Sequence, residues 1–151
     1  MSDSIAIASD HGGRQLKQKI IELLQSLNLT VQDFGVPPDD PTSVDYPDFA
    51  LQVAQAVAGQ KVTKGILVCG TGIGMSIAAN KVQGIRAALI WDEFTARMSR
   101  AHNNANILCL GERVVNHDRA LDFVKIWLET PFEGDRHQRR LDKIHSLESD
   151  A

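Results

Sequence analysis

The chain has 151 residues and a mass of 16.6 kDa, and 43% of its residues are hydrophobic. This length can bury one core and is too short for two ordinary domains, so we expect a single domain over residues 1–151. A formal net charge of −3 and a pI near 5.9 exclude a general attraction to nucleic acid or to an anionic membrane, and we expect neither as a partner.

The sequence also carries no signal for export or membrane insertion. Its N-terminus lacks the basic and apolar regions of a signal peptide, and no apolar run approaches the roughly 20 residues needed to cross a bilayer. The two cysteines, Cys69 and Cys109, are too few for a disulfide framework and lack metal-ligand spacing. We therefore expect a cytoplasmic protein without a metal centre.

Short β-rich runs alternate with longer helical patterns along the chain. The first run, 5–8, is followed by apolar residues at helical spacing from Leu16 to Leu27. The second run, 30–34, leads into a proline-rich loop, after which Pro47 opens a helix. The later predicted strands are 65–69, 85–90 and 106–110, and the later predicted helices are 74–81, 93–102 and 117–129, the last with Asn116 as its cap.

Strands that are apolar on both faces and separated by helices predict a parallel sheet covered on both sides. We therefore expect an α/β fold, a doubly wound three-layer α/β/α sandwich with a five-stranded parallel sheet. The polar run 133–140 leads into Leu141, Ile144 and Leu147, which predicts a C-terminal helix that docks elsewhere. Ligand sites in such folds lie beyond the carboxyl ends of the strands.

A glycine loop follows the predicted strand 65–69 and opens the next helix. Its residues are Gly70, Thr71, Gly72, Ile73 and Gly74. Backbone amides and a helix N-terminus at this place can bind an anion, and the absent side chains permit close approach. Two other interpretations stay open: a tight turn without a ligand, and a dinucleotide site with Asp92 near the ribose. The spacing G-x-G-x-G, in place of G-x-G-x-x-G, disfavours the dinucleotide site.

Cys69 stands at the end of that strand, directly before the loop. Amides at a helix N-terminus favour a thiolate over a thiol, so Cys69 is a candidate base or nucleophile. The alternative is a small buried apolar residue, which is how we interpret Cys109.

Further polar residues are placed to exchange protons or donate hydrogen bonds. Asp10 and His11 end the first strand, and His102 and Asn103 follow a predicted helix. Tyr46 is either an apolar lid residue or a hydroxyl donor.

Arg136 and Arg140 lie four residues apart, so a helix places them on one face with His137 beside them. Such a group suits a doubly charged phosphate, and Arg113 from another loop is a further candidate ligand. The alternative is a solvated basic helix face. An extended nucleic-acid surface is disfavoured because acidic residues interrupt the basic run.

The order and spacing of five motifs resemble those of the type B ribose-5-phosphate isomerases. The motifs are Ser9-Asp10-His11-Gly12-Gly13, Asp45-Tyr46-Pro47, Cys69-Gly70-Thr71-Gly72-Ile73-Gly74, Ser99-Arg100-Ala101-His102-Asn103 and Arg136-His137. The resemblance extends over residues 5–144. It implies a Rossmann-like homodimer with its active sites between the subunits. Such an enzyme interconverts ribose 5-phosphate and ribulose 5-phosphate through a cis-enediolate, without a metal or an organic cofactor.

The resemblance also implies roles in the chemistry. By matching position, Cys69 is the base that moves a proton between C1 and C2, and the amides of residues 70–74 stabilise the enediolate. Thr71 and His102 match residues linked with opening of the furanose ring. Asp10 matches a residue linked with proton transfer among substrate hydroxyls.

The remaining matches are contacts to the substrate. Tyr46 and Asn103 match sugar contacts. The matched phosphate ligands are His11, Arg113, Arg136, His137 and Arg140. The family more usually carries glycine where this chain has Asp135, so a negative charge is added beside the predicted phosphate clamp.

Three alternatives stay open. The same parts fit isomerases of six-carbon sugar phosphates, such as allose 6-phosphate and galactose 6-phosphate, or of four-carbon sugar phosphates. A non-catalytic module that binds a nucleotide or a sugar phosphate is an alternative of a different class. The pairing of dimers into tetramers is also left undecided.

Overall fold

The predicted order of strands and helices is confirmed in a computed structural model, which describes residues 3–148. The strands are β1 (Ser4–Ser9), β2 (Thr30–Asp33), β3 (Lys64–Cys69), β4 (Ala87–Leu89) and β5 (Ile107–Gly111). The helices are α1 (Arg14–Ser26), α2 (Tyr46–Ala58), α3 (Ile73–Ala79), α4 (Glu93–Ala101), α5 (His117–Glu129) and α6 (Arg136–Ser146). Within the described part of the chain, none of these helices is long and apolar enough to cross a membrane.

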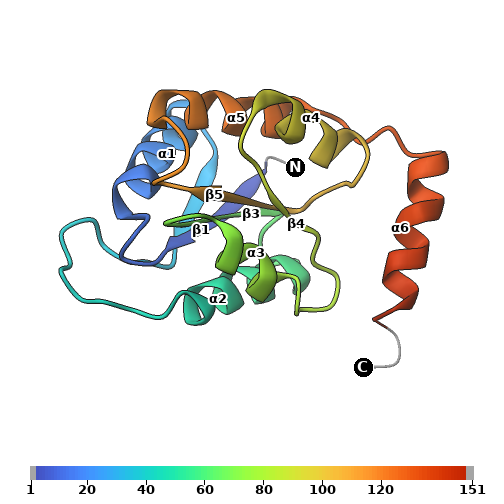
Figure 1. The fold of residues 1–151 in the computed structure, drawn as a ribbon. Coiled ribbons are helices and arrows are strands. Elements are labelled where there is room, and N and C mark those ends of the chain that lie inside the picture. Colours follow the sequence, from blue (N-terminus) through green and yellow to red (C-terminus); the bar gives the residue numbers. More distant parts are fainter. Residues whose placement is uncertain (1–2, 149–151) are drawn as a thin grey trace.

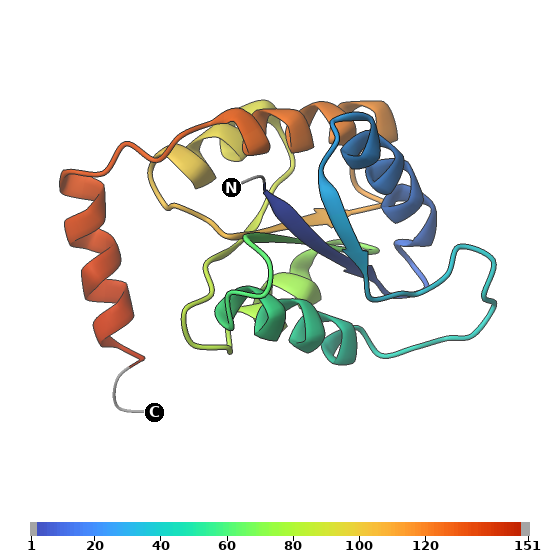
Figure 2. The same cartoon turned by 180° about the vertical axis from the view of Figure 1, so that it is seen from behind.

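All five strands are parallel and stand in the order β2-β1-β3-β5-β4. Figures 1 and 2 show α1, α4 and α5 over one face of the sheet and α2 and α3 over the other. Ile66 and Trp127 are fully buried on the first face, and Leu67 and Met75 are fully buried on the second. Burial on both faces is the reason for the continuous apolar run of β3. The predicted three-layer sandwich around a parallel sheet is therefore confirmed.

Helix starts follow their sequence signals. Asn116 Oδ1 accepts hydrogen bonds from the amides of Asp118 and Arg119, which confirms the predicted cap of α5. Pro47 lies in the first turn of α2, as predicted.

The edge strand β4 is shorter than the predicted strand 85–90, and a side chain replaces a backbone partner just before its first residue. The amide of Arg86 donates to Asn106 Oδ1 at 2.8 Å, and the side chain of Asn80 pairs with both backbone groups of Ala87. Side chains that satisfy an edge in this way also protect it from pairing with another strand.

Helix α6 stands at the end of the molecule opposite the loop between β2 and α2, as both views show (Figures 1 and 2). Leu141 is only 2% exposed, and Arg86 Nη1 lies 3.0 Å from His145 Nε2. Arg136 and Arg140 on the same helix are exposed. The helix is therefore attached to its own chain by one side and presents basic side chains to solvent on another.

One buried ion pair joins α1 to the end of β2. Lys17 is fully buried, and its Nζ lies 2.8 and 2.7 Å from the two carboxylate oxygens of Asp33, whose side chain is 39% exposed. Asp33 Oδ1 also accepts a hydrogen bond from Gly35 N at 2.9 Å. The pair therefore fixes the point at which the chain leaves β2.

The two partners of this pair differ in what their loss leaves behind. Asp33→Ala leaves a buried ammonium group unpaired, so we expect the free energy of unfolding to fall by about 3–5 kcal/mol. Lys17→Met keeps the side-chain volume and leaves Asp33 partly hydrated, so we expect a loss below about 1.5 kcal/mol. Urea unfolding of both variants measures the difference, and equal losses would contradict this account.

Candidate active site

A cavity of about 410 Å³ opens beside the carboxyl ends of β1 and β3. Its lining residues are Asp10, Tyr46, Cys69, Gly70, Thr71, Ile73, Gly74 and Ile77. All of them except Ile77 are site residues predicted from the sequence. We call this part of the molecule, with His11 and Arg113 beside it, the thiol edge. Its place agrees with the rule that ligand sites lie beyond the carboxyl ends of parallel strands.

Cys69 is the last residue of β3, lines the cavity and is 5% exposed. Its Sγ accepts a hydrogen bond from the amide of Gly72 at 3.1 Å. An amide donor stabilises negative charge on sulfur. The second thiol, Cys109, is fully buried within β5, and burial raises the pKa of that thiol. Only one of the two cysteines therefore stands where it can meet a ligand.

Two glycines of the loop are required by contacts of the chain with itself. Gly72 has a φ of 79°, and a Cβ at this residue would lie 2.6 Å from Leu89 Cδ1. A Cβ on Gly74 would lie 2.6 Å from ring atoms of Tyr46. The sequence predicted glycine here for the approach of a ligand, whereas packing of the chain already demands it at both positions.

Backbone amides orient Asp10 and Thr71. Asp10 is 8% exposed, and its Oδ1 accepts a hydrogen bond from Gly12 N at 2.8 Å. Thr71 Oγ1 accepts from Ile73 N at 3.2 Å, which leaves the hydroxyl hydrogen to donate elsewhere. Both side chains are therefore held at the cavity with polar atoms that a ligand can use.

His11 and Arg113 flank the cavity. His11 Nδ1 accepts a hydrogen bond from Val44 N at 3.2 Å, so Nε2 carries the proton of the neutral ring. Arg113 N donates to Gly70 O at 3.0 Å, and Arg113 Nη1 lies 3.4 Å from the point where a Cβ on Gly70 would stand. These two predicted phosphate ligands are therefore brought to the thiol edge.

Five predicted residues lie at the opposite edge of the sheet, which we call the clamp edge. They are His102, Asn103, Arg136, His137 and Arg140. The first residue of β5, Ile107, pairs with Gly65, whereas its last residue, Gly111, pairs with Cys69. The four steps from Gly65 to Cys69 cover about 13 Å at about 3.3 Å per residue. A single chain therefore does not bring these five residues to the thiol.

Two imidazoles and a carboxylate form a compact group at the clamp edge. The rings of His102 and His137 are stacked, with centroids 4.1 Å apart and planes inclined by 13°. Glu133 Oε2 lies 3.4 Å from His137 Nε2 and 3.8 Å from His102 Nε2. Burial lowers the pKa of the His137 imidazole, and the positive groups around it act in the same direction, against Glu133. The neutral form of His137 is therefore favoured near neutral pH.

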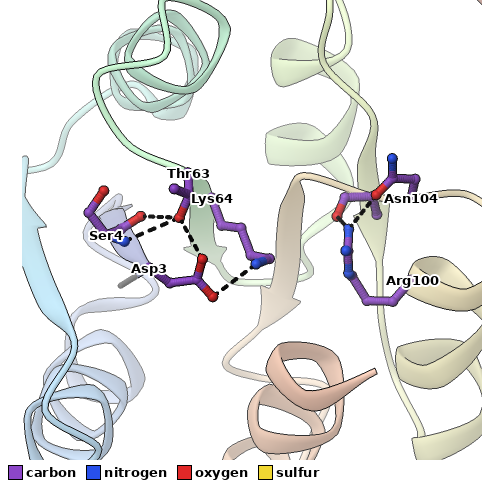
Figure 3. Close-up of polar contacts among 7 residues, drawn as sticks. Asp3, Ser4, Thr63, Lys64, Arg100 and Asn104 are labelled. Atoms are coloured by element: carbon purple, nitrogen blue, oxygen red, sulfur yellow. Dashed lines mark hydrogen bonds and ion pairs between the residues drawn. The ribbon is translucent and has the colours of Figure 1, made fainter. Parts of the chain in front are cut away.

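The turn that carries His102 and Asn103 is held by the preceding helix. Arg100 Nη1 donates to Asn104 Oδ1 at 2.9 Å and to Ala105 O at 2.7 Å, and Figure 3 shows the contact with Asn104. This arginine therefore fixes the path of the chain directly after the two predicted site residues.

Arg136 and Arg140 lie one turn apart on α6, as the sequence predicted. Asp135, the residue before this helix, has a φ of 51°, a backbone conformation that glycine adopts at lower cost. This geometry is a physical reason for the glycine that the resembled family usually carries there. Asn103 lines a cavity of about 240 Å³ together with Leu141 of α6.

The sequence did not point to two carboxylates that join these parts. Glu112 Oε1 accepts a hydrogen bond from Leu16 N at 2.6 Å, and Glu112 N donates to Cys69 O at 2.8 Å, so this residue ties the thiol edge to α1. Glu133 lies four residues before His137, and this spacing was the only feature of the sequence that could have indicated their contact.

Asp92, which the dinucleotide interpretation placed near a ribose, has another task. Its Oδ1 accepts from Thr95 N at 2.7 Å and from Thr95 Oγ1 at 2.8 Å, which caps α4. This helix cap explains the place of Asp92 after β4 without a ribose.

Comparison with known proteins places these features in a family. The family model described as Ribose/Galactose Isomerase matches residues 5–144. Ribose-5-phosphate isomerase B of Escherichia coli is 46% identical over 144 residues, which cover 95% of each chain.

Two solved structures are similar over nearly their whole length. The ribose-5-phosphate isomerase B of Clostridium thermocellum has 53% identity and a TM-score of 0.94, covering 97% of this chain and 98% of that one. That of Mycoplasma genitalium, solved with bound ribulose-5-phosphate, has 47% identity and a TM-score of 0.93, covering 100% and 99%. The chain therefore belongs to the ribose/galactose isomerase family and is an aldose-ketose isomerase.

Proposed function

We propose that this protein interconverts ribose 5-phosphate and ribulose 5-phosphate through a cis-enediolate, with Cys69 as the base. The E. coli relative is named for this activity, and the M. genitalium relative binds ribulose-5-phosphate. The observation that carries the mechanism is the hydrogen bond from Gly72 N to Cys69 Sγ at the wall of the cavity. Removal of a proton next to a sugar carbonyl needs a positioned base of this kind.

The loop amides have separate tasks in this proposal. The amide of Gly72 is engaged by the thiol, and that of Ile73 is engaged by Thr71 Oγ1. The first amides of a helix have no acceptor within it, so Gly74 at the start of α3 retains a donor. We assign stabilisation of the enediolate oxygen to the amides of Thr71 and Gly74, where one such donor is worth about 100- to 1,000-fold in turnover.

The active site in this proposal is completed by a second copy of the chain. The thiol edge holds the base, and the clamp edge holds His102 and the exposed pair Arg136 and Arg140, at least about 13 Å away along the sheet. In the proposed homodimer, the clamp edge of each subunit faces the thiol edge of the other. The dimer then has two complete active sites. His102 then opens the sugar ring, assisted by Thr71, and the arginines bind the phosphate.

The phosphate lies remote from the reacting carbons, so its binding energy can hold the open chain in the reactive pose. A mechanism in which the phosphate positions the substrate and the thiolate moves the proton needs no cofactor. Both cysteines are free thiols, which accords with a reducing cytoplasm.

Purified protein assayed with a panel of aldose and ketose phosphates tests the substrate. We expect the highest kcat/KM with the ribose 5-phosphate and ribulose 5-phosphate pair. Higher kcat/KM with a six-carbon phosphate would contradict this assignment and favour the galactose branch of the family.

Cys69→Ala removes the proposed base. We expect kcat to fall at least about 100-fold, while binding of a non-reacting sugar-phosphate analogue changes little. Cys109→Ala is the matched control, since that thiol is buried within β5, and its kcat should stay within about twofold of the wild type. Near-normal turnover of Cys69→Ala would rule out the thiolate base.

Arg136→Ala and Arg140→Ala each remove one charged donor from the clamp. A charge-assisted hydrogen bond is worth about 1.5–3 kcal/mol, so we expect KM to rise about 10- to 100-fold, with a smaller effect on kcat. Arg139→Ala, an exposed arginine on the same helix, is the control. An unchanged KM in both clamp variants would contradict the phosphate clamp.

Mixed dimers test whether each site uses two subunits. At a substrate concentration near the wild-type KM, Cys69→Ala and the double variant Arg136→Ala/Arg140→Ala should each have little activity alone. After co-expression, half of the dimers are hybrids with one intact site each, so we expect about one quarter of the wild-type activity. No recovered activity, with hybrids detected by native mass spectrometry, would place each site within one chain.

A further inference from the structure

We propose that His102, Glu133 and His137 form a binding site for a late first-row divalent cation such as Zn²⁺, and that its occupation inhibits isomerisation. Metal binding in this proposal stands on the geometry of the three side chains. Inhibition rests on the proposed function, because it requires that His102 and His137 contact the substrate.

The ligand atoms already converge. One nitrogen from each imidazole and one carboxylate oxygen lie within 4.8 Å of one another. Glu133 Oε2 is 3.4 Å from His137 Nε2 and 3.8 Å from His102 Nε2. Tetrahedral zinc with bonds of about 2.0–2.1 Å holds its ligand atoms about 3.3 Å apart, so the carboxylate oxygen already lies near the required distance from both nitrogens.

Ligand chemistry selects the cation. Two imidazoles and one carboxylate are the ligand set of many open zinc sites, in which water or a ligand occupies the fourth position. Imidazole suits zinc, cobalt, nickel and copper, whereas magnesium and calcium prefer oxygen ligands. The site should therefore discriminate strongly against Mg²⁺.

The main adjustment falls on the more exposed of the two imidazoles. Because the two rings are stacked, a cation cannot lie in both ring planes until one ring turns. The side chain of His137 is 6% exposed and packed, whereas that of His102 is 39% exposed and stands at the end of α4. The backbone of Glu133 is held there, because its amide donates to Ala101 O at 3.0 Å.

Neighbouring charges act in both directions on the three ligands. Arg136 and Arg140 oppose a cation, while the carboxylate of Glu133 favours it. The arginines are exposed, so water screens their repulsion. A bound cation would hold both imidazoles and so remove them from the substrate.

Cobalt titration of the full chain tests binding without reference to activity. We expect saturable visible absorption bands of Co²⁺ bound to nitrogen and oxygen, displaced by Zn²⁺ and absent with Mg²⁺. The bands should persist in Cys69→Ser, which excludes the thiol as the ligand. Glu133→Gln should weaken binding at least about tenfold. Glu129→Gln, at an exposed residue that ends α5 before Glu133, is the matched control and should bind as the wild type does.

Inhibition is measured on the same variants. We expect Zn²⁺ to inhibit isomerisation reversibly, with an inhibition constant at least about tenfold higher in Glu133→Gln than in Glu129→Gln. Absence of saturable cobalt bands, or equal binding in the two variants, would overturn the metal site. Binding without inhibition would keep the metal site and contradict the assignment of His102 and His137 to the substrate.

Discussion

All five strands run in one direction, and this constraint decides where the chemistry can lie. Residues that follow strands gather at one edge of the sheet, and residues that precede strands gather at the other. Cys69 is the last residue of β3, whereas His102 precedes β5. The sheet therefore separates Cys69 from His102 by its own length, and in the proposed function only a second copy, turned so that unlike edges meet, removes that separation.

The glycine loop shows how one short segment meets two demands at once. Gly72 adopts a conformation that few other residues tolerate, and this turn directs its amide at Cys69 Sγ. Gly74 lets the ring of Tyr46 close against the start of α3. Since the same glycines satisfy packing and present amides, their occurrence alone cannot tell a tight turn from an anion site. In the proposed function, the contact of the Gly72 amide with the thiol favours an active-site loop over a tight turn alone.

The fold could be predicted from the sequence because the strands β1, β3 and β5 are buried on both faces. Each of them therefore appears in the sequence as a short continuous apolar run. The start of β4 could not be predicted in this way, since the amide of Arg86 before it pairs with the side chain of Asn106, which is distant along the chain. The strand-end rule likewise placed Asp10 and Cys69 together. It could not place Glu133, which lies in the irregular segment between α5 and α6 and meets His102 only through folding.

A site assembled from two edges needs both edges to be rigid. Displacement of a binding group by about 1 Å can remove a large part of its effect on the reaction rate. Helix α6 meets this demand through contacts with its own chain, by burial of Leu141 and by the contact of Arg86 with His145. In the proposed dimer, the clamp is thus fixed to the sheet of one subunit before it meets the thiol of the other, so the precision of the site follows from how firmly two rigid bodies associate.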